Sequence, residues 1–275
     1  MRKPRPVGHP INAKRFNTWI NEFASYRHAV TQVLIEGFLN QFDQGDRDLA
    51  GRLLDSVDFY ASQRIAALLR TALQSIEGWH ANPAQRVGRW RFVSLSGSAG
   101  KSGDVMLHHF RLANNLDGKQ SDEMFIYRSE LPSQNLTADD TVVFVDDLTA
   151  TGTQVCEVWE EQFAELVAGA GHVFLIVVVA GKGARSEIKK NTDLRLVPGH
   201  VLGEKDSLFS HECPYFTAAE KARLNHYSRI ANPRLPAGFG NCGYVVVFQH
   251  RCPNNTVALL HETNARWTGL FPRHG

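Results

Sequence analysis

The stretch TVVFVDDLTATGTQ, residues 141–154, decides the fold predicted for this chain. It opens with four consecutive strand-formers, Val142 to Val145, which is typical of a strand buried on both faces of a parallel sheet. Two carboxylates, Asp146 and Asp147, follow the run, and a short loop of threonine, alanine and glycine comes next. Beyond this loop, apolar residues recur at helical spacing among glutamates. The stretch therefore predicts a strand, an acidic strand end, a loop and a helix, in that order.

This order of elements suits a sugar phosphate. The first turn of a helix carries N–H groups without internal partners, which favour an anion, and Thr149, Thr151 and Thr153 add hydroxyl donors. Asp146 and Asp147 repel a phosphate, but they accept hydrogen bonds from sugar hydroxyls. The structural alternative is an ordinary strand-to-helix turn with capping threonines and solvated aspartates.

The same stretch resembles the phosphoribosyl-pyrophosphate (PRPP) signature of type I phosphoribosyltransferases, which has a hydrophobic strand, two acidic residues and a T-x-T-G-x-T-like loop. The resemblance implies that Asp146 and Asp147 hold the ribose 2′ and 3′ hydroxyls. It also implies Mg²⁺, bound mainly through ligand and water oxygens, with these two aspartates as its candidate protein contacts. The residues that would wrap the 5-phosphate are Thr149, Ala150, Thr151, Gly152 and Thr153.

The residue at position 150 bears on which acceptor substrate the resemblance implies. Many purine-specific relatives carry an aspartate at the place of Ala150, as a candidate base near the purine ring. Its absence argues against a purine-salvage enzyme and leaves the acceptor open.

A second loop, GSAGKSG (residues 97–103), lies between a strand expected at 90–96 and a helix expected at 104–115. The resemblance makes it the pyrophosphate loop, in which Lys101 supplies charge to the departing group. Its implied contacts are Ser98, Ala99, Gly100 and Lys101. The GKS ending also fits a P-loop NTPase, but that pattern requires glycine at position 95, where the chain has leucine. The P-loop alternative also leaves the threonine loop unexplained.

The resemblance further implies a strand at 123–130 whose basic residue reaches the pyrophosphate. Arg128 takes that role, although Ser129 replaces the usual lysine. A surface ion pair with Glu130 is the structural alternative for Arg128. Residues 131–140 fall where the family keeps a flexible lid, and the segment is short here.

Further apolar strands at 172–180 and 194–197 complete an α/β pattern, which predicts a parallel sheet with its site at the carboxyl ends of the strands. We expect a type I phosphoribosyltransferase-like core with an N-terminal cap of two long helices, 13–42 and 48–79, and an irregular C-terminal extension. The expected parts are a flexible basic lead (1–12), the helical cap (13–85), the core (86–200) and the C-terminal hood packed on the core (201–275).

The C-terminal part contains a helix expected at 215–230, with Thr217 as its N-cap, and a strand expected at 244–248. The strings CPNNT (252–256) and W-x-x-L-F-P-R (267–273) resemble a divergent phosphoribosyltransferase branch of bacterial conflict and antiphage modules, some of them encoded beside retrons. This resemblance implies a toxic effector role with a partner protein or ribonucleoprotein. A homodimer is a further expectation, because many relatives dimerise.

Composition gives no indication of a nucleic-acid-binding or membrane protein. The apolar fraction is 43%, the charged fraction 21% and the net charge +2, so no strong nucleic-acid or membrane argument arises. We expect a cytoplasmic protein, because no long apolar run or signal peptide is found. The four cysteines do not form a disulfide framework. A zinc site is an alternative to free thiols, with the ligands His211, Cys213, Cys242, His250 and Cys252.

The function expected from these patterns is transfer or cleavage at the ribose anomeric carbon of PRPP, or of a related ribose phosphate, with pyrophosphate as leaving group. Asp146, Asp147, Lys101 and Arg128 are the expected catalytic residues. A non-catalytic regulator that binds PRPP or a nucleotide is the first alternative, and a P-loop-like NTPase is the second.

Overall fold

The computed structural model describes residues 10–95 and 102–273. These residues form two compact units. Unit 1 is drawn from Met1–Ala61 and Gly203–Gly275, and unit 2 is the continuous segment Ser62–Leu202. Unit 2 is thus inserted into unit 1, which is assembled from the two ends of the chain.

Unit 2 is built on a four-stranded parallel sheet in the order β2-β3-β4-β5. The strands are β2 (Trp90–Ser94), β3 (Thr141–Thr149), β4 (His172–Gly181) and β5 (Arg195–Leu202). The first five residues of β3 and nine of the ten residues of β4 are buried, which explains their continuous apolar runs. The predicted parallel α/β fold is confirmed.

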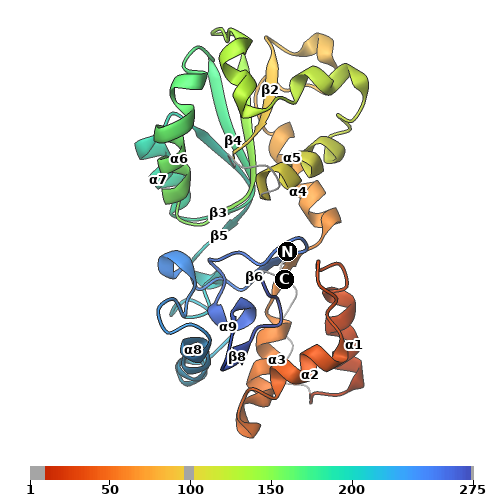
Figure 1. Ribbon diagram of the computed structural model, residues 1–275, viewed down its shortest axis with the longest axis vertical. Helices are drawn as coiled ribbons and strands as arrows, with labels where there is room; N and C mark the ends of the chain where they lie inside the picture. The colour runs from red at the N-terminus through yellow and green to blue at the C-terminus, as the bar shows by residue number, and fades with distance from the viewer. Residues whose placement is uncertain (1–9, 96–101, 274–275) are drawn as a thin grey trace. The chain divides into compact units, whose positions relative to one another are not determined.

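Helices cover both faces of this sheet (Figure 1). The helices α4 (Ser62–Gln74) and α5 (Ser102–Ala113) pack together on one face. On the other face α6 (Thr153–Val158) packs with α7 (Ala184–Asn191). The chain after α6 continues as the π-helix η5 (Trp159–Phe163) and the 3₁₀ helix η6 (Glu165–Val167).

The strand expected at 123–130 is not formed. Two 3₁₀ helices occupy the segment, η3 (Lys119–Met124) and η4 (Arg128–Gln134), and only Phe125 pairs with the sheet, through a parallel bridge to Phe92. Aromatic packing explains this single contact, because the Phe125 ring lies 5.2 Å from that of Phe92. A rudimentary edge strand therefore stands beside β2, and the chain changes direction across the sheet between β2 and β3.

The amino end of the sheet is tied by an ion pair. The Arg89 guanidinium bonds Asp140 Oδ2 at 2.6 Å and also donates to the carbonyl oxygens of Gln134 and Asn135. Asp140 Oδ2 further accepts from the backbone N–H and the hydroxyl of Thr137. These bonds to its charged form hold the pKa of Asp140 well below its usual range. Most of the segment expected as a lid is thus 3₁₀ helix or anchored turn.

Unit 1 joins three N-terminal helices to the C-terminal segment. The helices are α1 (Ala13–Glu22), α2 (Gln32–Leu39) and α3 (Arg47–Asp55), and the short strand β1 (Asp58–Tyr60) pairs in parallel with β6 (Val246–Phe248). The 3₁₀ helix η1 (Gln44–Asp46) precedes α3, and η2 (Pro83–Gln85) precedes β2 in unit 2. The remaining elements are η7 (Glu204–Asp206), α8 (Ala218–Ala231), η8 (Phe239–Asn241), α9 (Ala258–His261), β7 (Thr263–Asn264) and β8 (Trp267–Thr268).

Neither of the two long helices expected in the cap is continuous. Residues 23–31 interrupt the first, and β1 replaces the middle of the second, so Val57 and Tyr60 are not helical. The residues of β1 are all buried, and a fully buried strand has the same apolar content as a buried helix. The second half of the expected cap, α4, packs on β4 and β5 of unit 2. The compact units therefore divide the chain differently from the four expected parts.

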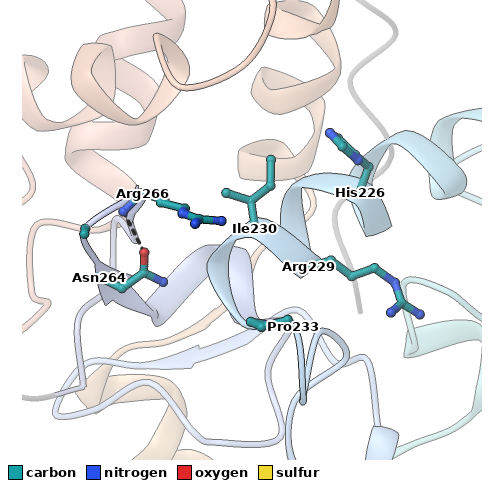
Figure 2. A pocket seen from close by; sticks show the side chains of 7 residues that line it. His226, Arg229, Ile230, Pro233, Asn264 and Arg266 are labelled. Atoms are coloured by element: carbon teal, nitrogen blue, oxygen red, sulfur yellow. Dashed lines mark hydrogen bonds between the residues drawn. The ribbon is translucent and has the colours of Figure 1, made fainter.

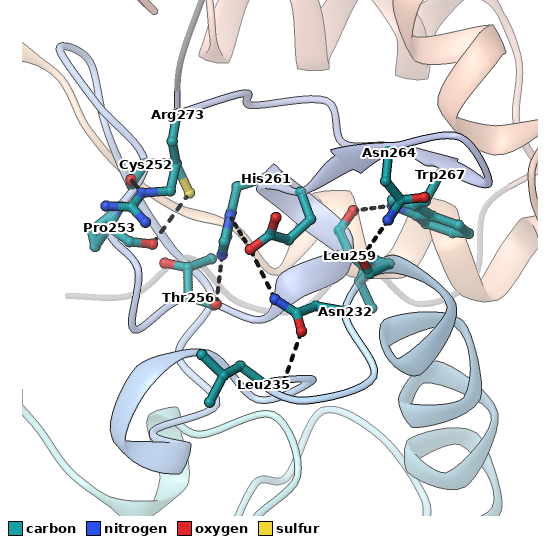
Figure 3. A network of polar contacts seen from close by, with 12 residues as sticks. Asn232, Leu235, Cys252, Pro253, Thr256, Leu259, His261, Asn264, Trp267 and Arg273 are labelled. Carbon is teal, nitrogen blue, oxygen red and sulfur yellow. Dashed lines mark hydrogen bonds and ion pairs between the residues drawn. The ribbon is translucent and has the colours of Figure 1, made fainter.

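The C-terminal strings CPNNT and W-x-x-L-F-P-R lie in the core of unit 1 (Figure 3). The Thr256 hydroxyl donates to the Val246 carbonyl at 2.6 Å, and the Trp267 Nε1–H donates to the Leu259 carbonyl at 2.8 Å. The Phe271 ring packs edge-on against Phe23 of the N-terminal part, with 4.9 Å between ring centroids. These strings therefore hold the two ends of the chain together.

The cap of α8 is the one expected. The Thr217 hydroxyl accepts from the Glu220 N–H at 3.3 Å, and the Glu220 carboxylate accepts from the Thr217 N–H at 2.8 Å. Glu220 also pairs with Arg52 at 2.8 Å, and this hydrogen bond lowers the pKa of Glu220 to about 2. In the part of the chain that the structure describes, no helix is both long and apolar enough to cross a bilayer.

Candidate functional site

Asp146 and Asp147, called the acid pair below, lie where β3 extends beyond the end of β2. β2 pairs with β3 as far as Ser94 opposite Val145, whereas β4 follows β3 as far as Ala180 opposite Thr149. Asp146 and Asp147 occupy the first two positions of this overhang, at the carboxyl end of the sheet. The change of chain direction between β2 and β3 falls at the same place. In open α/β sheets, ligands bind at such a switch point, outside the carboxyl ends of the strands.

Both carboxylates are half-buried, and each turns one oxygen back onto its own strand. Asp146 Oδ1 accepts from the Asp147 N–H at 2.8 Å, and Asp147 Oδ1 accepts from the Leu148 N–H at 2.7 Å. Asp146 stands opposite Val177 of β4, which belongs to the cluster under α6 and α7. Side chains alternate along a strand, so Asp147 belongs to the α4–α5 face. The two carboxylates are therefore fixed in orientation and diverge.

The threonine loop is not uniform. Thr149 and Ala150 are buried, and Thr149 still pairs with β4 as a strand residue. Thr151 is half-buried and Thr153 exposed, and their hydroxyl oxygens lie 3.1 Å apart. The Thr151 hydroxyl also accepts from the Thr153 N–H at 3.3 Å. Two hydroxyls and one backbone amide thus gather at the start of α6.

Gly152 gives the loop its shape. Its φ of +89° is a left-handed conformation that side chains disfavour. A Cβ at this position would also lie 3.1 Å from the Ala184 carbonyl oxygen and 3.2 Å from Ile188 Cγ1. Glycine is therefore needed both for the turn and for the close approach of α7.

After the loop, every fourth residue of the helical segment packs against β3. Val155, Trp159, Phe163 and Val167 are all buried in one cluster. An α-helix drifts by about 40° over four residues, and the wider π-turn of η5 rotates the other way, so the four remain on one face. The Phe163 ring packs 4.6 Å from that of Phe144, two residues before the acid pair.

Arg128 is not placed beside the acid pair by its described contacts. Its Nη1 donates to Gln162 Oε1, and its guanidinium lies over the Phe163 ring at 5.2 Å. Glu130 instead accepts from the Tyr127 N–H at 2.6 Å. Gln162 was not among the predicted residues, and no spacing in the sequence indicates this partner.

The predicted pyrophosphate-loop contacts Ser98, Ala99, Gly100 and Lys101 lie outside the described residues. The neighbouring elements bound that loop: β2 ends at Ser94 and α5 begins at Ser102. The described residue before this loop that still pairs in the sheet, Ser94, lies opposite Val145, which immediately precedes the acid pair.

No zinc arrangement is found among residues 10–95 and 102–273, where no three His, Cys, Asp or Glu side chains gather as metal ligands. Cys213 and Cys252 are buried in the core of unit 1, and burial raises the pKa of the Cys252 thiol to about 12. Carboxylate oxygens remain the donors that suit Mg²⁺, which commonly takes one or two carboxylates and completes its shell with water and phosphate. Asp146 and Asp147 fit that donor set.

A protein-family model named PRTase-CE matches residues 35–273. Orotate phosphoribosyltransferase from Aeropyrum pernix is 19% identical, over 49% of this chain and 69% of that one, with a TM-score of 0.32. Hypoxanthine-guanine phosphoribosyltransferase from Schistosoma mansoni, solved with IMP, is 13% identical over 52% of this chain and 64% of that one, also with a TM-score of 0.32. Likeness at this level carries no argument about the site. No curated protein matches the chain.

Proposed function

This chain belongs to the PRTase-CE family, and from that premise we propose that its acid pair and threonine loop bind PRPP, or a related ribose phosphate, together with Mg²⁺. The observation that carries the proposal is the overhang of β3, which sets Asp146 and Asp147 just beyond the last paired residue of β2, Ser94, and ahead of the threonine turn. One strand end thus offers acceptors for sugar hydroxyls and donors for phosphate, which is the set of groups that a ribose phosphate requires.

The reaction we propose is departure of pyrophosphate from the ribose anomeric carbon. The C–O bond breaks with its electron pair leaving on pyrophosphate, and an acceptor nucleophile or water forms the new bond to carbon. Positive charge develops on the sugar, so groups fixed near it contribute most through electrostatics and positioning. Mg²⁺, when bound with the substrate, would neutralise charge on the leaving group.

Each residue has a role in this proposal. Asp146 and Asp147 orient the ribose hydroxyls, and their bonds to the following amides fix both carboxylates before substrate arrives. The turn from Thr149 to Thr153 holds the 5-phosphate, with the Thr151 and Thr153 hydroxyls at its exposed end. Lys101 would meet the pyrophosphate, and Arg128 would do so only after exchanging Gln162 for the ligand.

The first test is ligand binding. At a hundredfold excess over its dissociation constant, PRPP with Mg²⁺ should raise the free energy of unfolding by about 2.7 kcal/mol. Thermal unfolding with PRPP, ribose 5-phosphate and nucleotides measures this. Absence of any shift with all of them would contradict the proposed site.

The second test removes the acid pair. The double change Asp146→Asn, Asp147→Asn should abolish binding and PRPP turnover, because hydrogen bonds to a charged group contribute about 1.5–3 kcal/mol each. The unliganded thermal midpoint should hold or rise slightly, because two adjacent like charges are removed. A matched control is Asp117→Asn, Asp193→Asn, which neutralises two carboxylates of the same unit away from the acid pair. A double variant that unfolds easily, yet works normally when folded, would make the pair structural.

The same assays separate the alternatives. Release of pyrophosphate distinguishes an enzyme from a regulator that only binds PRPP or a nucleotide. ATP hydrolysis that is lost in Lys101→Ala would favour a P-loop NTPase instead. A defence effector with a partner protein or ribonucleoprotein would arrest growth when expressed without that partner, and the arrest should depend on Asp146 and Asp147.

A further inference from the structure

A pocket of about 440 Å³ lies in unit 1, between the last turns of α8 and the β7–β8 hairpin (Figure 2). Its size falls within the range of small-molecule sites. Seven residues line it, and none of them is acidic: His226, Arg229, Ile230, Pro233, Asn264, Ala265 and Arg266. The proposed ribose-phosphate site belongs to unit 2, so this pocket is a separate feature.

The lining combines an apolar floor with cations on both sides. In Figure 2 the Arg266 guanidinium extends from the hairpin toward Ile230, while Arg229 and His226 project from α8 on the other side of Ile230. Pro233 extends the apolar surface beyond the end of the helix. Among the residues that the structure describes, the guanidinium groups of Arg229 and Arg266 have no hydrogen-bond or ion-pair partner. Two arginines around an apolar floor favour an anion with an apolar body.

Polar groups next to the pocket are engaged in hydrogen bonds within unit 1. The carbonyl oxygens at a helix C-terminus repel negative charge, but the Ala231 carbonyl accepts from Asn264 Nδ2 at 2.7 Å. Asn264 Oδ1 in turn accepts from the Arg266 N–H at 2.8 Å, which fixes the backbone of the hairpin turn. The nearby carboxylate of Glu262 accepts from Asn232 Nδ2 at 3.1 Å.

The helix dipole of α8 does not by itself explain why two arginines line this pocket. Arg229 stands in the last turn of α8, where any cation is favourable. Arg266 comes from a different element and is exposed, yet it lies on the same pocket. We infer that this pocket is a binding site for a small organic anion, whose apolar body rests on Ile230 and Pro233 and whose phosphate or carboxylate oxygens meet Arg229 and Arg266.

The test measures binding to the full chain by calorimetry, with two anions of different chemistry. AMP carries a phosphate on an apolar ring system, and phthalate carries carboxylates. Adenosine and inorganic phosphate each supply only one half of the required groups. Every titration is repeated in the Arg229→Gln, Arg266→Gln protein, in which the proposed ribose-phosphate site is unchanged, and only the binding lost in that protein is assigned to this pocket. AMP, phthalate or both should bind more tightly than adenosine or phosphate, and the preferred anion identifies the source of the oxygens.

Variants then locate the site. Arg266→Gln should weaken binding of the preferred anion to this pocket at least tenfold, and adding Arg229→Gln should remove the binding assigned to the pocket. The matched control is Arg47→Gln, which removes the same charge from an exposed position of unit 1 outside the pocket, and it should leave affinity unchanged. Ala265→Glu places a carboxylate in the pocket and should abolish binding while the thermal midpoint is kept. Failure of both anions to bind at millimolar concentration, or equal affinity in the Arg229→Gln, Arg266→Gln protein, would overturn the inference.

Discussion

At the scale of single residues, an ion pair and its hydrogen bonds stabilise the amino end of the sheet. Asp140 is buried and accepts bonds from both Arg89 and Thr137, whereas its neighbour Asp139 is exposed. Sequence patterns do not separate the two, because both stand in the same polar turn before β3. The acid pair at the other end of β3 was predictable, because it interrupts an apolar run. The contact between Arg128 and Gln162 was not, because it depends on how a π-turn is placed.

Asp140→Asn should therefore lower the free energy of unfolding by about 1.5–3 kcal/mol, the range for hydrogen bonds to charged groups. Denaturant unfolding measures the loss, and Asp139→Asn is the matched control that should change little. The folded-state pKa of Asp140 lies below its unfolded value, so its stabilisation is complete above about pH 5 and is lost as pH falls further. Stability of the Asp140→Asn protein should accordingly fall less between about pH 5 and pH 2 than that of the unmutated protein. Equal pH profiles for the two proteins would contradict this account.

At the scale of elements, strands with continuous apolar runs were predicted well, and the helices of the N-terminal part were not. β3 and β4 are buried on both faces, so composition alone identifies them. β1 has only three residues, and its pairing with β6 spans most of the chain, so no local pattern reveals it. The threonine turn was identified correctly as a turn, but its left-handed glycine and its contact with α7 are properties of the packed structure.

Gly152→Ala tests this turn. The positive φ and the contacts at 3.1 Å should together cost about 1–3 kcal/mol of stability, and the distorted turn should also weaken binding of PRPP. Gly183→Ala is the matched control, because Gly183 precedes α7 with a φ of −73° and open space around its Cβ position. That protein should be unchanged or slightly more stable. Chemical denaturation and calorimetry with PRPP measure the two effects, and equal behaviour of the two variants would refute the role given to Gly152.

At the scale of the whole molecule, the chain is an insertion of one unit into another. The family match, residues 35–273, covers unit 2 and parts of both segments of unit 1. The sequence indicated the sheet of unit 2 through its strand–loop–helix repeats. It did not indicate that residues before 62 pack with residues after 202, because this pairing depends on contacts such as Phe23 with Phe271.

The two units should differ when they are expressed separately. The continuous fragment 62–202 contains the whole four-stranded sheet and should unfold cooperatively by circular dichroism. The fragment 1–61 should be largely unfolded alone, because its aromatic core residues find their partners near the C-terminus. Adding the fragment 203–275 should restore helical signal. A cooperatively folded fragment 1–61 would contradict the division into these units.

The insertion also sets an order of events on the ribosome. Tyr26 donates its hydroxyl hydrogen to the Pro272 carbonyl, and Phe23 packs against Phe271, so these contacts cannot form until residues 271 and 272 have been synthesised. At synthesis rates of roughly 5–20 residues per second, that wait lasts about 12–50 s. The inserted unit can fold during this time, while Phe23, Tyr26 and Phe38 still lack their contacts with Trp267 and Phe271. In the nascent chain these aromatic side chains are therefore open to chaperones and proteases after the segment that follows them has already folded.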